Sequence, residues 1–206
     1  MVGRTGARIG AGIVTVLLAS VLLAGCGTQE EEPVMTAREG RDKVVQLVKD
    51  SAQQLDVTGW WARGTASAIP CEGDPDNASQ YVYHYWAPEG DDPQADAKRM
   101  AEYWESLGMT VYTTGQDGSA PMVFGRGGPV LRASFDTLGA DRSYHIDAIA
   151  PCSPGLYVEF NREDSAVRDR GEVLPGDDVK VPESEIGEKF DEHRRLAEEA
   201  DRKKNQ

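Results

Sequence analysis

A histidine and an aspartate stand two residues apart in the apolar run 143–150. If this run alternates as a strand, His145 and Asp147 share one of its faces. An imidazole beside a carboxylate can bind a metal ion or act as a general base. A strand histidine with a polar neighbour more commonly has no such role. The pattern therefore remains one candidate, and neither a metal site nor a catalytic residue is assigned.

The other signatures of enzymes and cofactor sites are missing from the sequence. It contains no GxSxG, HExxH, P-loop or dinucleotide glycine motif. Two acidic clusters, 72–77 and 89–92, lack the bidentate glutamate of a twelve-residue calcium loop, so we interpret them as solvated turns. We predict no cofactor.

Tyrosines at every second position of the run 80–87 form the candidate binding surface. Tyr81, Tyr83 and Tyr85 must share one face of a strand, because side chains alternate between the two faces. Tyrosine tolerates half-exposure, since its hydroxyl can stay hydrated. We expect these rings on the less covered face, where they would dock an envelope protein or a glycan. The alternative is that they pack in the core. The opposite face would then carry Val82, His84 and Trp86.

The N-terminal segment predicts export. Arg4 and Arg8 precede an apolar run that ends in small residues before Cys26, which is typical of a secretory signal. The residues Leu23-Ala24-Gly25-Cys26 resemble the lipobox of bacterial lipoproteins. The resemblance implies cleavage before Cys26, diacylation of its sulfur and a location on the extracytoplasmic face of the cell membrane. The alternatives are a plain signal peptide or an uncleaved anchor, which would be at the short limit for spanning a bilayer.

The net charge of the chain limits the kinds of partner that it can bind. The formal net charge is −13, which argues against nucleic acid and against electrostatic adhesion to anionic lipids. The link to the membrane should therefore be the acyl chains on Cys26, because stable anchoring needs two signals and a diacylated cysteine supplies them.

The remaining two cysteines predict one disulfide. Cys71 and Cys152 each follow a proline at the end of an apolar run. An even pair outside the cytoplasm is expected to be oxidised. A metal or redox site is less favoured, because neither cysteine belongs to a CxxC pair or a ligand cluster.

The order of the predicted elements indicates an α+β fold. Thr36 and Glu39 have capping-box spacing and start a helix that Thr58-Gly59 ends. Asp92-Pro93 starts a second helix, and Gly108 ends it. Strands are predicted at 60–69, 80–87, 109–114, 121–125, 129–136, 143–150 and 156–160, with a polar turn at 72–79. We expect an antiparallel-rich sheet of about five to six strands with two helices on one face and one disulfide.

The sequence therefore divides into four parts: a signal peptide (1–25), an acidic tether (26–35), an α+β domain (36–161) and a charged tail (162–206). Within the tail, 162–182 reads as a disordered linker and 184–204 as a solvated helix.

This plan resembles the small secreted lipoproteins of actinobacteria. The resemblance implies a lipid-anchored, non-catalytic binding or envelope-accessory module. A small extracytoplasmic hydrolase or metal-dependent enzyme is the alternative.

Overall fold

The computed structural model describes residues 35–118, 120–139 and 143–179. The predicted signal peptide, Cys26, nearly all of the tether and the helix predicted at 184–204 lie outside these residues. Among the described residues, no helix is both long and apolar enough to cross a membrane.

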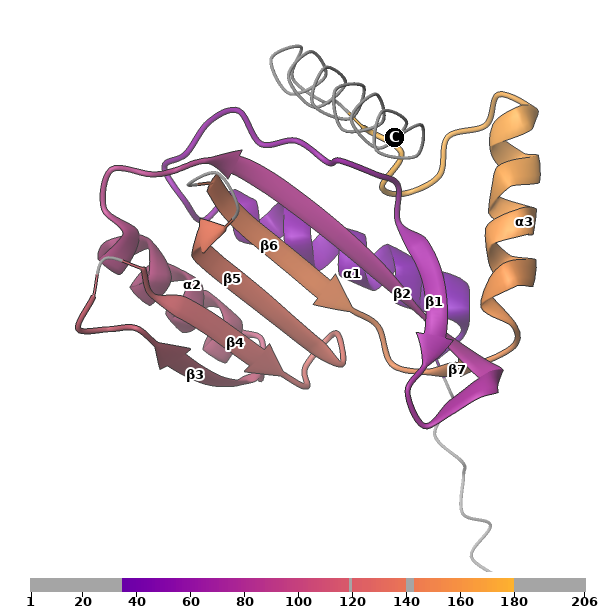
Figure 1. Ribbon diagram of the computed structural model, residues 1–206, viewed down its shortest axis with the longest axis horizontal. Coiled ribbons are helices and arrows are strands. Elements are labelled where there is room, and N and C mark those ends of the chain that lie inside the picture. The colour runs from indigo at the N-terminus through magenta and orange to yellow at the C-terminus, as the bar shows by residue number, and fades with distance from the viewer. Residues whose placement is uncertain (1–34, 119, 140–142, 180–206) are drawn as a thin grey trace, which may run out of the picture. The chain divides into compact units, whose positions relative to one another are not determined.

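The core of the domain is an antiparallel sheet, as predicted. Its strand order is β1-β2-β6-β5-β4-β3, and the short β7 pairs with the first part of β2 (Figure 1). Sequential hairpins join β3 to β6, whereas β2 and β6 are neighbours despite the long intervening segment. The strands are β1 (Ser67–Cys71), β2 (Asp74–Pro88), β3 (Thr110–Thr114), β4 (Met122–Arg126), β5 (Arg132–Gly139), β6 (Ser143–Ile149) and β7 (Ser153–Pro154).

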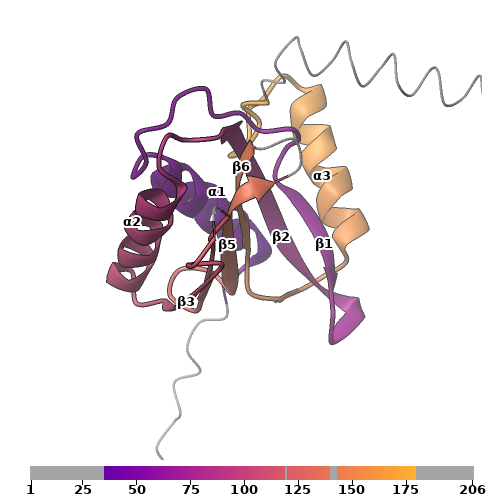
Figure 2. The ribbon, with the colours of Figure 1, turned by 60° about the vertical axis from the view of Figure 1, so that its left-hand side comes forward.

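Both predicted helices are present and cover one face of the sheet (Figure 2). Helix α1 (Ala37–Ala52) begins with the predicted capping box of Thr36 and Glu39. Helix α2 (Pro93–Ser106) begins where Asp92 accepts a hydrogen bond from the Ala95 amide at 3.0 Å. These caps satisfy backbone donors that a helix start leaves free.

The two helices meet over a shared buried contact. Trp104 of α2 is fully buried, and its Nε1 donates a 2.8 Å hydrogen bond to Ser51 Oγ of α1. Around this contact the core is filled by the inward rings and aliphatic side chains of the sheet, including Tyr83, Phe135, Tyr144 and Ile146.

The start of the sheet differs from the prediction. β1 covers only the last part of the run 60–69, although Trp61 forms an isolated bridge with Trp86. The predicted turn at 72–79 is wrong, because β2 already begins at Asp74. This early part of β2 gains a second partner, since Ala78 and Ser79 pair with β7. The tertiary pairing overrides a polar sequence that favours a turn.

The strand predicted at 156–160 is also wrong: the chain there enters helix α3 (Tyr157–Asp169). Local sequence cannot decide between the two, because the run is short and apolar. The contacts of α3 explain the outcome. Phe160 packs against Tyr81, and the Asn161 side chain bonds both the N–H and the C=O of Ala68, at 2.9 and 2.8 Å. The amide of Asn161 thus occupies hydrogen-bonding groups of the edge strand β1 that would otherwise be open to another chain.

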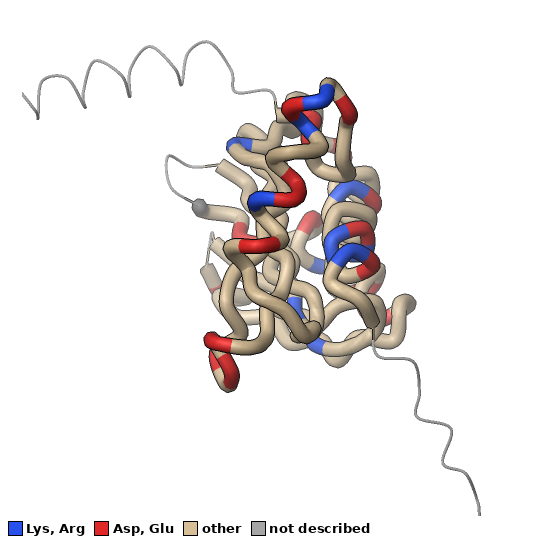
Figure 3. The backbone as a smooth tube through the Cα atoms, turned by 90° about the vertical axis from the view of Figure 1, so that its right-hand side faces the viewer, with Lys and Arg blue, Asp and Glu red and all other residues tan. Residues whose placement is uncertain are grey.

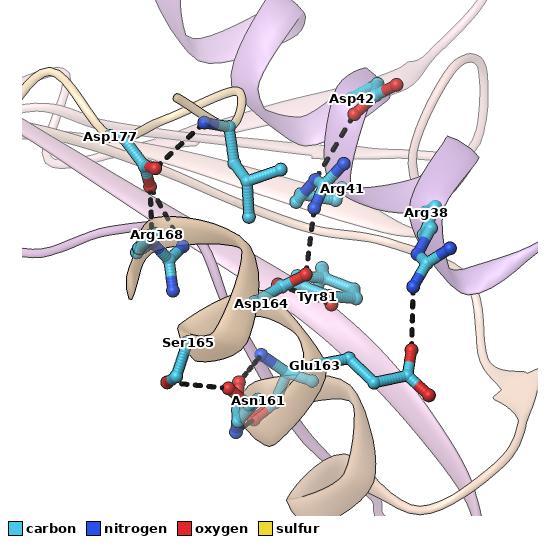
Figure 4. Close-up of polar contacts among 12 residues, drawn as sticks. Arg38, Arg41, Asp42, Tyr81, Asn161, Glu163, Asp164, Ser165, Arg168 and Asp177 are labelled. Atoms are coloured by element: carbon cyan, nitrogen blue, oxygen red, sulfur yellow. Dashed lines mark hydrogen bonds and ion pairs between the residues drawn. The ribbon is translucent and has the colours of Figure 1, made fainter. Parts of the chain in front are cut away.

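A buried ionic contact holds α3 on the domain (Figure 4). Arg41 Nη1 of α1 lies 3.0 Å from Asp164 Oδ1, and the Tyr81 hydroxyl donates to Asp164 Oδ2 at 2.8 Å. The Arg41 and Asp164 side chains are only 7% and 3% exposed. Burial, and then the hydrogen bond to Asp164, raise the pKa of Tyr81, so its hydroxyl remains protonated and can donate.

The disordered linker predicted at 162–182 is therefore wrong for residues 162–179. The predicted domain boundary at 161 falls inside α3. Beyond the helix, Asp177 pairs with Arg168 of α3 at 2.8 Å, and Asp178 pairs with Lys49 of α1 at 2.8 Å. On the side of the domain that carries α3, acidic and basic residues are interleaved (Figure 3). Some of the charged residues in this segment thus form ion pairs that hold it on the domain.

The predicted disulfide is confirmed. Cys71 and Cys152 are bonded, with their Cα atoms 6.0 Å apart. The bond ties the end of β1 to the connection between β6 and β7 and closes a loop across 81 positions. In the chain-entropy description, a loop of this length corresponds to about 4 kcal/mol of stabilisation.

Candidate functional site: the open face of the sheet

The tyrosines chosen as a binding surface face the helices. Tyr81 and Tyr83 are 1% and 0% exposed, and the half-buried Tyr85 stacks on Trp60 at 5.7 Å. The prediction that this face is the less covered one is wrong. Because Tyr81 and Tyr83 are closed off from solvent and Tyr85 packs on the same face, we withdraw the docking role for Tyr81, Tyr83 and Tyr85.

The opposite face of the sheet is not covered by α1 or α2 (Figures 1 and 2). The strand registers identify its residues, because directly paired residues point to the same side. One row runs Tyr112, Phe124, Ser134, Asp147, His84, and the next includes Asp136, His145 and Trp86. We call this surface the open face. It consists of Tyr112, Phe124, Arg126, Arg132, Ser134, Asp136, His145, Asp147, His84 and Trp86.

Two separate stacks of rings lie on the open face. Tyr112 and Phe124 stack with centroids 4.8 Å apart, and Tyr112 is 51% exposed. Trp86 stacks on His145 at 4.0 Å, and the guanidinium of Arg63 lies over the Trp86 ring, 4.0 Å from its centroid. Each stack holds its rings in place, which lowers the entropy lost when a ligand binds to them.

Ser134, Asp136 and Asp147 lie between the two stacks, on β5 and β6, and His84 lies on β2 beside the Trp86–His145 stack. His84 Nδ1 lies 3.2 Å from His145 Nε2, and Asp147 accepts a hydrogen bond from Ser134 Oγ. Burial lowers the pKa of both histidines, while the nearby Asp147 carboxylate acts in the opposite direction. Both imidazoles are therefore held mainly neutral at neutral pH, each with one donor and one acceptor nitrogen.

A shallow groove of about 340 Å³ opens beside these polar groups. Its floor and walls combine Tyr112 and Phe124 with Ser134 and Asp147, and two arginines complete it: Arg126 and Arg132. A larger hollow of about 740 Å³ lies between α2 and β3, but alanines and isolated polar side chains line most of it. Convergent polar groups beside rings are typical of ligand sites. The larger hollow has a single ring, Tyr112, whereas the smaller one combines the Tyr112–Phe124 stack with charged and hydroxyl side chains.

The arrangement does not resemble the machinery of a hydrolase. The predicted face-sharing of His145 and Asp147 is confirmed, and His84 joins them. The nearest hydroxyl, on Ser134, donates to the carboxylate and not to an imidazole, so no general base contacts it. Within the described residues, no group of three or more His, Cys, Asp or Glu side chains could hold a metal ion.

The acidic clusters have structural roles where the structure describes their contacts. Asp74 accepts a 2.9 Å hydrogen bond from the Asn77 amide, and Asp92 caps α2.

Several residues of the open face were missed by sequence reasoning. The run 129–136 alternates in the sequence, and its polar positions Arg132, Ser134 and Asp136 do face outward. That alternation was a usable signal. The sequence gives no such signal for Tyr112, Phe124 and Arg126, because runs as short as β3 and β4 do not show a clear alternation between two faces.

No protein-family model, curated protein or solved structure matches the chain.

Proposed function

We propose that the protein is a lipid-anchored, extracytoplasmic, non-catalytic binding module that takes a glycan of the cell envelope on its open face. The observation that carries this proposal is the alternation of ring stacks and hydrogen-bonding side chains across the sheet face that neither α1 nor α2 covers. Aromatic rings can pack on the apolar face of a sugar, while carboxylate, hydroxyl and imidazole groups bond its hydroxyls.

A glycan fits this surface better than a folded protein. The centre of a protein–protein interface is depleted of charged residues, and its apolar anchors cluster together. Here the centre carries Ser134, Asp136 and Asp147, and the two ring stacks lie to either side. A hydroxyl-rich chain can satisfy these central polar groups, whereas an apolar partner surface would leave them without hydrogen bonds.

The proposed anchor places this surface among envelope polymers. The support is the run Leu23-Ala24-Gly25-Cys26 with its basic and apolar flanks. Cys26→Ala should release the chain from the membrane fraction or stall its processing. Recovery of a membrane-bound chain that retains Met1 and carries no acyl mass would contradict the anchor.

The binding proposal is tested by retention of the full chain, in detergent, on the insoluble polysaccharide fraction of the producing bacterium's envelope. Tyr112→Ala should lower retention at least tenfold. Tyr157→Ala is the matched control, because Tyr157 is an exposed tyrosine of α3, away from the open face. Equal retention of both variants and the wild type, or no retention of the wild type, would contradict the proposal.

A further inference from the structure

Two arginines lie directly opposite each other on the open face, and neither has a side-chain partner among the described residues. Arg126 of β4 and Arg132 of β5 are directly paired across the strands, and both are exposed. In the described part of the chain, neither guanidinium makes a hydrogen bond or an ion pair with another side chain. Like charges directly opposite each other destabilise a sheet. The chain has 35 acidic and 22 basic residues, yet no described carboxylate neutralises this pair.

The surroundings of the pair indicate what would neutralise it. Both arginines line the 340 Å³ groove, together with the Tyr112–Phe124 stack and Asp147. A guanidinium presents a planar fork of donors that matches a carboxylate or a phosphate. The two forks can therefore hold one anionic group while the adjacent rings pack against the flat body of the same ligand.

The carboxylate of Asp147 selects between these anions. It lies in the same groove, so it repels a second negative charge and accepts hydrogen bonds from hydroxyl donors. A phosphate dianion would place more negative charge beside Asp147 and would offer its carboxylate no hydrogen-bond donor. A ligand unit with a single carboxylate and neighbouring hydroxyls can pair its carboxylate with the two arginines and donate hydrogen bonds from its hydroxyls to Asp147.

We propose that Arg126 and Arg132 form a carboxylate subsite, so that the glycan bound on the open face contains acidic sugar units of the uronic-acid class. This inference rests on the proposed function and adds the chemical class of the ligand. Binding should weaken with added salt, because ion pairing to exposed arginines is screened.

The test compares acidic chains with their neutral counterparts on the full chain in detergent. Oligosaccharides of glucuronate, galacturonate and mannuronate are titrated by calorimetry beside the same chains with each carboxyl reduced to an alcohol. At least one acidic chain should bind tenfold or more tighter than its neutral form. Arg126→Gln and Arg132→Gln should each abolish most of that preference.

Two controls distinguish the effect of these two arginines from a general loss of positive charge and from a loss of folding. Arg162→Gln removes the same charge from exposed α3 and should leave the preference unchanged. The melting temperatures of Arg126→Gln and Arg132→Gln should not fall, because each removes a like-charge contact.

The outcomes distinguish the two proposals. Equal binding of acidic and neutral chains, or a preference that survives both arginine substitutions, overturns the subsite but leaves glycan binding standing. Tighter competition by glucose 6-phosphate than by glucuronate also overturns it. Absence of binding by every acidic and neutral chain overturns the subsite, and the retention experiment then decides the proposed function by itself.

Discussion

His84 Nδ1 and His145 Nε2 lie 3.2 Å apart on the open face, close enough for one imidazole to donate to the other. This contact requires one nitrogen to carry a hydrogen and the other to offer its lone pair. Protonation of both rings places two N–H groups against each other. The charged groups that act on the pair are Asp147 and Asp136, which favour the cationic form, and Arg63, which opposes it at His145.

The histidine pair should make stability fall in mild acid. The pKa of each imidazole is lowered in the folded protein, first because of burial, so the unfolded chain binds more protons below its own pKa of about 6.5. The stabilisation is complete above pH 6.5 and is lost as the pH falls from there toward the lowered values. Melting temperatures between pH 7.5 and 5.5 measure it. The double variant His84→Gln/His145→Gln should show a flatter profile, and profiles parallel to the wild type would contradict this account.

Asp164→Ala should strongly destabilise the domain. It removes the buried ion-pair partner of Arg41, which keeps only the exposed Asp42 at 3.3 Å, and it removes the acceptor of the Tyr81 hydroxyl. Breaking a buried pair in this way costs about 3–5 kcal/mol. Urea unfolding gives the difference, and trypsin should cut α3 sooner in the variant. The neighbouring Glu163→Ala is the control, because its pair with Arg38 is exposed and should cost less than about 1 kcal/mol. Similar losses in the two variants would contradict the role of Asp164.

Tyr83→Ala should behave as a core substitution. The Tyr83 ring is fully buried, so its removal should cost about 3–5 kcal/mol in the free energy of unfolding. Tyr112→Ala, on the exposed edge strand, should cost less than about 1 kcal/mol. Chemical denaturation of both variants makes the comparison. A small loss of stability for Tyr83→Ala would contradict the assignment of these tyrosines to the core.

Local signals predicted most of the fold. The Thr36–Glu39 box and Asp92-Pro93 placed α1 and α2, because caps are set by neighbours in the sequence. The disulfide followed from the number of cysteines and the predicted compartment. Helix α3 could not be predicted in this way, since contacts with residues far along the chain stabilise it, such as that between Asp164 and Arg41.

The site was harder to predict because it depends on which face of β2 meets the helices. Both faces of the run 80–87 are aromatic, so periodicity gives two faces but does not say which is buried. The register decides it: His84 pairs with Asp147 and Trp86 with His145, which aligns the polar positions of β2 and β6 on one side. The alternating polar positions of β5 also identify one polar side, but only the strand order shows that it is the same side as that of β2 and β6.

The most direct test of the central claim maps the envelope glycan on the full chain by NMR. The titration uses the polysaccharide fraction that retains the protein, after partial hydrolysis to soluble fragments. The account predicts the largest shifts at Phe124, Ser134 and Asp147 and at the indole of Trp86, with little change in α1, α2 and α3. Shifts concentrated in α1 or α2, or in the hollow between α2 and β3, would contradict the assignment of the open face as the binding surface.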